Sequence, residues 1–340
     1  MLGINRNAAV CDWHTKADQL RYTRLGRGGP VISNIGLGSL ALSGAYGPIG
    51  GHEAFGLIRK AMDSGVTLLD TADFYAAGEV ERLVGRAIAG RRDEVVVSTR
   101  GGVRHGGPGE PIEFDASPDY LARACEASLN RLGVDYVDLY YLHCQDDRVP
   151  VEEAVSRLSE LVRAGKIRYL GLSNGTFDQV RRAHAVHPVT ALAIEFSLWG
   201  RYAPPELLDE ARRLGLGVVA ARPLGRGFLT GRIRSPLQLG TGDWRHADPR
   251  FQQEHLRLSA RPLRQIEAAA AQLDLGAGRL ALAWLLSHGE HVVPVPSTRD
   301  QVHLEMNLAA SDVRLTPETR DRLAGILPSI SADHPGPLLL

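Results

Sequence analysis

The sequence has little cysteine, no net charge and no long hydrophobic run. Its three cysteines, Cys11, Cys125 and Cys144, are too few for a disulfide scaffold and too far apart for a metal-binding CxxC motif. Basic and acidic residues number 39 each, which argues against binding nucleic acid or an anionic membrane through bulk charge. No apolar segment is long enough to cross a bilayer, and His and Cys do not cluster at metal-ligand spacing. We therefore expect a cytoplasmic globular protein without a nucleic-acid, membrane or metal partner.

Eight short apolar runs, rich in Val, Ile and Leu, alternate with helical patterns. The runs cover residues 34–39, 66–71, 94–99, 137–143, 167–174, 191–197, 216–221 and 291–297. Apolar residues at helical spacing predict helices over residues 118–132, 151–164, 205–214 and 267–273. Eight buried strands alternating with helices indicate the α/β class and predict a (β/α)8 TIM barrel. A doubly wound dinucleotide-binding sheet is disfavoured, because the first strand lacks the GxGxxG spacing.

The predicted barrel is a single domain over residues 21–330. Residues 1–20 are expected to form a loosely ordered extension, without the apolar core of a signal peptide, and residues 331–340 a C-terminal tail. Residues 224–260, rich in Gly and Arg, interrupt the alternation between the seventh strand and its helix. Loops this long in a compact domain usually bind or cover a ligand. We expect this one to border the site.

Polar residues follow several predicted strands, where a barrel of this kind carries its active site. Asp70 and Tyr75 follow the second strand, Arg100 ends the third and His143 ends the fourth. A carboxylate, a phenol, a cation and an imidazole at one mouth suit proton transfer to a carbonyl oxygen. Taken singly, each has a structural alternative: Asp70 could hold a loop, Arg100 could simply pair with Asp70, and Asp73 is a rival for the acidic role.

Several motifs occur in the order of a known family. LLDTADFY, VVVSTRGG, DLYYLH, GLSN, RPLGRGFLTGR and VPVPSTRDQVHLEMNLAA resemble the successive motifs of the aldo-keto reductase superfamily over residues 20–328, and IGLGSLALSGAYGP and DWRHADPRF resemble its bacterial and plant reductases. The resemblance implies reduction of a small-molecule carbonyl substrate with NADPH. It implies Asp70 as the catalytic aspartate, Tyr75 as the proton donor and His143 as the contact to the carbonyl oxygen, with Arg100 in the place of a lysine.

The resemblance also implies an NADP(H) site across the barrel mouth. Its expected residues are Gly38, Ser39, Ser173, Asn174, Arg222, Leu224, Gly225, Arg226, Gly231, Arg232, Ser297, Thr298, Arg299, Gln301 and Asn307. The residues from Leu224 to Arg232 match a loop that covers the pyrophosphate. Ser297, Thr298 and Arg299 precede a helix, and their hydroxyls and guanidinium suit a 2′-phosphate. This favours NADP over NAD.

Three departures from the family pattern leave other functions open. Arg100 keeps a positive charge beside Tyr75 but effectively never deprotonates. Ala193 stands where the family commonly has a glutamine, and Ala221 where it has a tyrosine stacked on the nicotinamide. The next residue, Arg222, suits either the cofactor or an anion. The alternatives are a redox-silent NADP(H)-binding sensor or regulatory protein, and a non-redox dehydratase or epimerase on the same barrel.

Overall fold

The main sheet is a barrel of eight parallel strands. The computed structural model describes residues 20–104, 113–144, 146–200 and 204–327. The strands follow the order β12-β11-β10-β9-β8-β5-β4-β3. They are β3 (Leu37–Gly38), β4 (Leu68–Asp70), β5 (Val96–Gly101), β8 (Val137–His143), β9 (Ile167–Ser173), β10 (Val189–Glu195), β11 (Gly217–Ala221) and β12 (Val292–Pro294). Each overlaps one of the eight predicted runs, so the strand prediction is confirmed.

The sheet closes between β3 and the segment that follows β12. Gly38 forms a parallel bridge with Ser297, and its amide donates to the carbonyl oxygen of Pro296 at 3.1 Å. A Cβ atom on Gly38 would lie 2.7 Å from the carbonyl oxygen of Val295. Glycine therefore permits the close approach that completes the (β/α)8 barrel.

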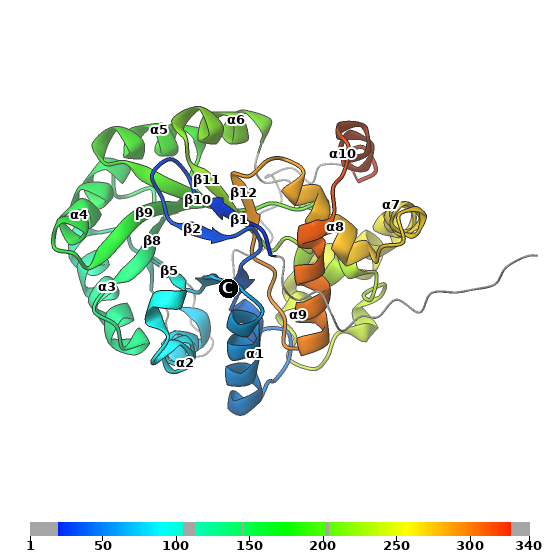
Figure 1. Cartoon of the computed structure of the whole chain (residues 1–340), viewed down its shortest axis with the longest axis horizontal. Helices are drawn as coiled ribbons and strands as arrows, with labels where there is room; N and C mark the ends of the chain where they lie inside the picture. The colour runs from blue at the N-terminus through cyan, green and yellow to red at the C-terminus, as the bar shows by residue number, and fades with distance from the viewer. Residues whose placement is uncertain (1–19, 105–112, 145, 201–203, 328–340) are drawn as a thin grey trace, which may run out of the picture.

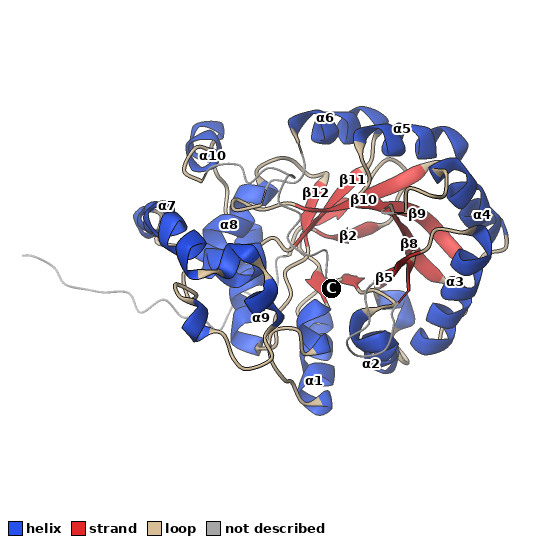
Figure 2. Ribbon diagram, turned by 180° about the vertical axis from the view of Figure 1, so that it is seen from behind, coloured by secondary structure: helices blue, strands red, loops and turns tan. Residues whose placement is uncertain are grey.

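Helices surround the barrel strands (Figure 1, Figure 2). They are α1 (Gly51–Asp63), α2 (Glu79–Ile88), α3 (Pro118–Leu132), α4 (Val151–Arg163), α5 (Phe177–Val186), α6 (Pro205–Leu214), α7 (Gln253–Gln272), α8 (Ala277–Leu286), α9 (Gln301–Leu308) and α10 (Pro317–Ala324). The predicted bounds of α3 and α6 are confirmed, and α4 ends one residue earlier than expected. No helix among the described residues is both long and apolar enough to span a membrane.

The long connection after β11 is shorter than the sequence predicted. Short 3-10 turns, η4 (Gly225–Thr230), η5 (Pro236–Gln238), η6 (Trp244–Ala247) and η7 (Pro249–Phe251), lead to α7. The predicted loop over residues 224–260 is therefore wrong beyond residue 252, and the helix predicted over residues 267–273 is the end of a longer one. Pro262 lies inside α7. A proline within a helix removes one backbone hydrogen bond and normally kinks or ends the helix. Burial of Leu256, Leu263 and Ile266 on one face stabilises the helix despite this residue.

A hairpin that the sequence did not predict packs against one end of the barrel core. Strands β1 (Tyr22–Arg24) and β2 (Val31–Ser33) pair antiparallel, and Leu25 and Ile32 pack with barrel-interior residues such as Leu68 and Val219. A second hairpin, β6 (Val103–Arg104) with β7 (Glu113–Phe114), follows β5. The predicted extension, except Leu20, and the predicted tail lie outside the described residues.

Candidate active site

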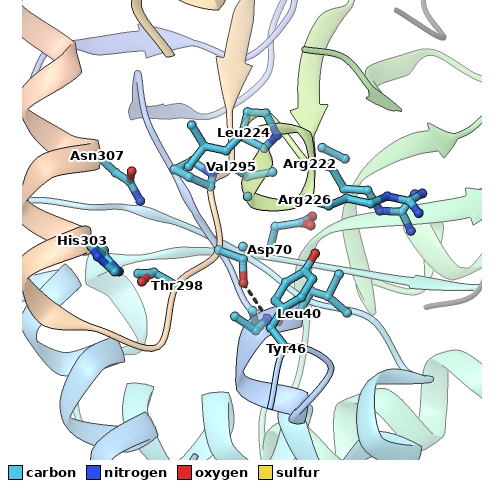
Figure 3. Close-up of a pocket in the computed structure, with 18 of the residues that line it drawn as sticks. Leu40, Tyr46, Asp70, Arg222, Leu224, Arg226, Val295, Thr298, His303 and Asn307 are labelled. Atoms are coloured by element: carbon cyan, nitrogen blue, oxygen red, sulfur yellow. Dashed lines mark hydrogen bonds between the residues drawn. The ribbon is translucent and has the colours of Figure 1, made fainter. Parts of the chain in front are cut away.

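A cavity of about 600 Å³ lies at the carboxyl ends of the barrel strands, where the sequence placed the active site. This volume is typical of small-molecule and cofactor sites. The predicted site residues that line it are Gly38, Ser39, Asp70, Tyr75, Arg100, His143, Ser173, Asn174, Arg222, Leu224, Arg226, Arg232, Ser297, Thr298, Arg299 and Asn307. Figure 3 shows Asp70 at the end of β4, Arg222 directly after β11 and Asn307 of α9 around the cavity.

Three predicted cofactor residues are not among the residues that line this cavity. Gly225 packs against Trp199, whose ring would lie 3.0 Å from an added Cβ atom. At Gly231 an added Cβ atom would lie 2.3 Å from Oε1 of Glu267. Both glycines have left-handed backbone angles, with φ of +56° and +77°, so they shape the connection after β11. Gln301 is exposed at the start of α9.

Asp70 and Arg100 form a buried ion pair at the ends of β4 and β5. The Nη2 atom of Arg100 lies 2.5 Å from Oδ2 of Asp70, and both side chains are at most 7% exposed. The hydroxyl of Ser98 donates to the other carboxylate oxygen at 2.7 Å. Arg100 also donates through Nε to the carbonyl oxygen of Thr71 and through Nη1 to Oγ of Ser173, each at 3.3 Å. The pairing that the sequence left as an alternative is therefore present, and it holds Arg100 at the cavity wall.

Tyr75 enters the cavity from a strained turn. It begins the 3-10 turn η2 (Tyr75–Gly78), and the next two residues, Ala76 and Ala77, have positive φ of 49° and 52°. Such angles are uncommon for residues with a side chain and cost of order 1–3 kcal/mol each. Burial raises the pKa of Tyr75, while the positive charge of Arg100 opposes that shift. The phenol therefore keeps its proton at neutral pH.

Asp73 is half-buried and is not among the residues that line the cavity. Its Oδ1 atom has no hydrogen-bond partner among the described residues. Burial, with Glu81 nearby, raises the pKa of this carboxyl well above its ordinary value. A carboxyl with a raised pKa outside the cavity is a poor candidate for the charged acidic role, which leaves Asp70 as the better one.

His143 ends β8 and presents a neutral imidazole to the cavity. Burial, with Arg100 and Arg222 nearby, lowers its pKa to about 3. The ring of Phe114 stacks on it at a centroid distance of 5.6 Å. Neither ring nitrogen has a partner among the residues described. Buried polar atoms normally have a hydrogen-bond partner, so this ring is suited to binding a ligand.

The predicted phosphate end of the cavity lies at the start of α9. Asp300 caps this helix by accepting a hydrogen bond from the His303 amide at 2.9 Å, so a carboxylate already lies at the helix N-terminus. Two of the predicted residues form hydrogen bonds within the protein. The hydroxyl of Ser297 accepts from the Ala41 amide at 2.6 Å, and Arg299 donates to the carbonyl oxygen of Pro48 at 2.9 Å. The hydroxyl of Ser297 and the guanidinium of Arg299 therefore already have protein partners at this end of the cavity.

A buried cluster of charged side chains forms another part of the wall. Glu195 at the end of β10 contacts Arg222 at 2.8 Å, Arg226 at 3.0 Å and Arg250 at 2.7 Å. Asp248 contacts Arg226, and Arg250 at 3.0 Å. Burial alone would raise the pKa of Glu195, but the three guanidinium groups hold it well below its usual range. Glu195 is therefore a carboxylate at neutral pH.

A model of the Aldo/keto reductase family matches residues 34–328. The chain belongs to the aldo/keto reductase family. It is 40% identical to a probable aldo-keto reductase of Glycine max over 300 residues, which cover 88% of this chain and 86% of the relative. A glycerol dehydrogenase from Gluconobacter oxydans matches with a TM-score of 0.81 and 27% identity, covering 90% of this chain and 94% of that one. An aldo/keto reductase from Klebsiella pneumoniae, in complex with NADP and acetate, matches with a TM-score of 0.70 and 28% identity. This match covers 92% of this chain and 96% of that one.

Some residues of this aldo/keto reductase site were not predicted from the sequence. Arg279, at the third position of α8, lines the cavity and donates to the carbonyl oxygen of Ala309 at 2.9 Å. Asp248 and Arg250 complete the Glu195 cluster from the connection after β11. Asp248 and Arg250 lie within the DWRHADPRF motif, but nothing in that motif predicts their contacts with Glu195, which is far away in the chain. The motif and the arginine content of the long connection were the signals that the sequence offered.

Proposed function

We propose that this aldo/keto reductase reduces an aldehyde or ketone to the alcohol with NADPH, and that Tyr75 donates the proton. The grouping of Tyr75, the Asp70–Arg100 pair and His143 on one cavity carries the proposal. Aldo/keto reductases are oxidoreductases that act on small carbonyl compounds. Two related structures from Klebsiella pneumoniae are complexes with NADP and with NADPH, which supports this cofactor.

The cavity fits such a dinucleotide. It extends from His143, whose ring nitrogens are buried without a partner among the described residues, to α9. Arg232, Arg279 and Arg299 line the α9 end and offer cations for phosphate oxygens. When bound, NADPH supplies the hydride.

The side chains of the site then handle the proton. The phenol of Tyr75 transfers its proton to the carbonyl oxygen as the carbonyl carbon accepts the hydride, so an O–H and a C–H bond form and the C=O π bond breaks. Arg100 remains charged and stabilises the phenolate left on Tyr75, which water reprotonates. Asp70 holds the Arg100 guanidinium in place. Neutral His143 donates a hydrogen bond to the carbonyl oxygen.

The redox-silent sensor is the second candidate. Its support is that Nε, Nη1 and Nη2 of Arg100 all donate to protein oxygens, those of Thr71, Ser173 and Asp70. Such an arginine can be purely structural. The sensor predicts cofactor binding without turnover, and a non-redox dehydratase or epimerase predicts conversion of a substrate without NADPH consumption.

The Tyr75→Phe variant tests the proton donor. It removes one hydroxyl from the cavity, so we expect NADPH oxidation to slow by about a hundredfold or more with the Kd of NADPH nearly unchanged. Tyr140→Phe is the matched control, since it also removes a phenolic hydroxyl, but Tyr140 is fully buried and is not among the residues that line the cavity. Residual activity of about a tenth or more in Tyr75→Phe would rule out Tyr75 as the acid.

A further inference from the structure

Within the described part of the chain, no hydrogen bond fixes the orientation of the His143 imidazole. The residue is 5% exposed, and both ring nitrogens are buried without a partner there. In a histidine that acts on a substrate, a hydrogen bond from one ring nitrogen commonly sets the tautomer and the direction of the other nitrogen. Packing is what orients this ring in the described structure.

Aromatic rings pack against the imidazole from two directions. The ring of Phe114 lies parallel to it, with a centroid distance of 5.6 Å and an interplanar angle of 4°. The ring of Phe74 meets it edge-on, with a centroid distance of 6.2 Å and an angle of 81°. A parallel stack restricts rotation of the imidazole about its Cβ–Cγ bond, because turning the ring would separate the two faces.

The two phenylalanines differ in their relation to the cavity. Phe74 lines the cavity and also contacts the ring of Tyr75 at a centroid distance of 5.0 Å. Phe114 is half-buried and is not among the residues that line the cavity. Phe114 therefore supports the ring of His143 without occupying the space that a substrate would take.

Backbone contacts hold Phe114 in place. It lies in β7, where it pairs with Val103 of β6. Its carbonyl oxygen accepts a hydrogen bond from the guanidinium of Arg148, which in turn donates to Asp146 at 2.8 Å. The carbonyl oxygen of Val103 accepts from the hydroxyl of Tyr120 at 2.6 Å. Both strands of the hairpin are therefore anchored, and the aromatic ring that they carry has a fixed place beside β8.

We propose that Phe114 is a positioning residue for His143: its stacked ring holds the imidazole in the direction of the substrate's carbonyl oxygen. The contact that it serves is the hydrogen bond from His143 to that oxygen, so the inference deepens the proposed function and rests on it for the reaction. The stacked face is what matters. Tyrosine at this position keeps the face, whereas leucine keeps apolar volume but has no flat face to offer.

Steady-state oxidation of NADPH by benzaldehyde tests the positioning role. We expect Phe114→Leu to lower kcat by about tenfold or more, with the Kd of NADPH nearly unchanged, because a rotating imidazole seldom presents a nitrogen to the carbonyl oxygen. Phe114→Tyr should retain most of the rate. Phe55→Leu is the matched control, since Phe55 of α1 is also a partly buried phenylalanine packed against the core, and it should leave kcat unchanged.

A double-variant cycle separates positioning from a general structural role. If Phe114 acts through His143, Phe114→Leu should change kcat by less than about twofold once His143→Asn has removed the imidazole. A general loosening of the barrel would instead lower kcat by the same factor in both backgrounds.

Nuclear magnetic resonance tests the contact without turnover. A phenyl ring stacked on an imidazole shifts the imidazole proton resonances upfield. The resonances of His143, identified by their loss in His143→Asn, should move downfield in Phe114→Leu and stay near their wild-type positions in Phe114→Tyr and Phe55→Leu.

Three results would overturn the inference. The first is a kcat of Phe114→Leu within about twofold of the wild-type value. The second is an equal loss in the wild-type and His143→Asn backgrounds, which would make the role of Phe114 purely structural. The third is a set of His143 resonances that Phe114→Leu does not move. Absence of NADPH oxidation by the wild-type protein with any carbonyl compound would contradict the proposed function instead, and the resonances would still show whether Phe114 orients the ring.

Discussion

At the scale of single residues, Arg100 decides how the proposed chemistry works. It is buried, paired with Asp70 at 2.5 Å and linked to Ser173 at 3.3 Å. Its charge lowers the pKa of Tyr75 against the opposing effect of burial. An arginine can supply this charge but cannot release a proton at accessible pH. Proton transfer is thus left to Tyr75 and water.

Replacing Arg100 with lysine tests whether that difference limits the rate. A lysine ammonium is more compact and can be deprotonated, so we expect Arg100→Lys to raise kcat severalfold on simple aldehydes. The measurement is steady-state NADPH oxidation, with the Kd of NADPH as the control for an intact site. A fall of more than about tenfold would mean that the hydrogen bonds of Arg100 to Thr71 and Ser173 matter more than proton exchange.

The protonation state of His143 predicts a pH profile. The pKa of His143 is lowered to about 3. His143 therefore stays neutral when the pH crosses the ordinary histidine pKa of about 6.5. We therefore expect kcat/KM between about pH 5 and 8 to show no inflection from this residue. His143→Asn should lower the rate without changing the shape of the profile. An inflection near neutrality that disappears in His143→Asn would contradict the neutral assignment.

Much of the candidate site could be read from the sequence, and the rest depends on contacts between distant segments. Asp70, Tyr75, Arg100 and His143 each follow or end a predicted strand, so the barrel topology alone brings them together. Arg250, which pairs with Glu195, is 55 residues away from it along the chain. No local pattern predicts that pairing.

At the scale of elements, the sequence predicted strands that are buried along their length and helices with one continuous apolar face. It did not predict very short strands or a helix that contains a proline. β8 is buried along its whole length, and α3 has a clear apolar face bounded by Pro118 and Gly133. The β1–β2 hairpin has strands of only three residues, too short for a periodic signal. Pro262, which lies within α7, is the reason that the sequence predicted only the last part of this helix.

A buried network joins α2 to its neighbours and predicts a stability effect. Glu81 of α2 is fully buried, accepts from Thr99 of β5 at 2.6 Å and pairs with Arg131 of α3 at 2.6 Å. Arg131→Met leaves the buried carboxylate of Glu81 without its arginine partner. We therefore expect a loss of about 3–5 kcal/mol in the free energy of unfolding. Urea denaturation measures this loss.

Two further variants make that test specific. Replacing both partners, in Glu81→Met with Arg131→Met, should recover much of the loss because no buried charge remains. Arg257→Met breaks an exposed pair with Glu254 and should change the free energy of unfolding far less than Arg131→Met. Equal effects of the buried and exposed single variants would show that the network does not stabilise the contact between α2 and α3.

At the scale of the whole molecule, the alternation of strands and helices was sufficient to predict the barrel. Eight apolar runs became eight parallel strands, and the active-site end followed from the topology. The exact closure of the sheet did not follow, because it depends on Gly38 approaching the Val295 backbone. The proposed function likewise belongs to the whole barrel, since its residues come from most of the strands.

The most direct test is titration of the purified protein with NADPH and with NADH, followed by NADPH absorbance during incubation with aldehydes and ketones. We predict tighter binding of NADPH than of NADH, and oxidation of NADPH that depends on a carbonyl substrate. Binding without oxidation on any carbonyl compound would contradict the reductase and support the sensor. Absence of NADPH binding would contradict the cofactor assignment on which the account depends.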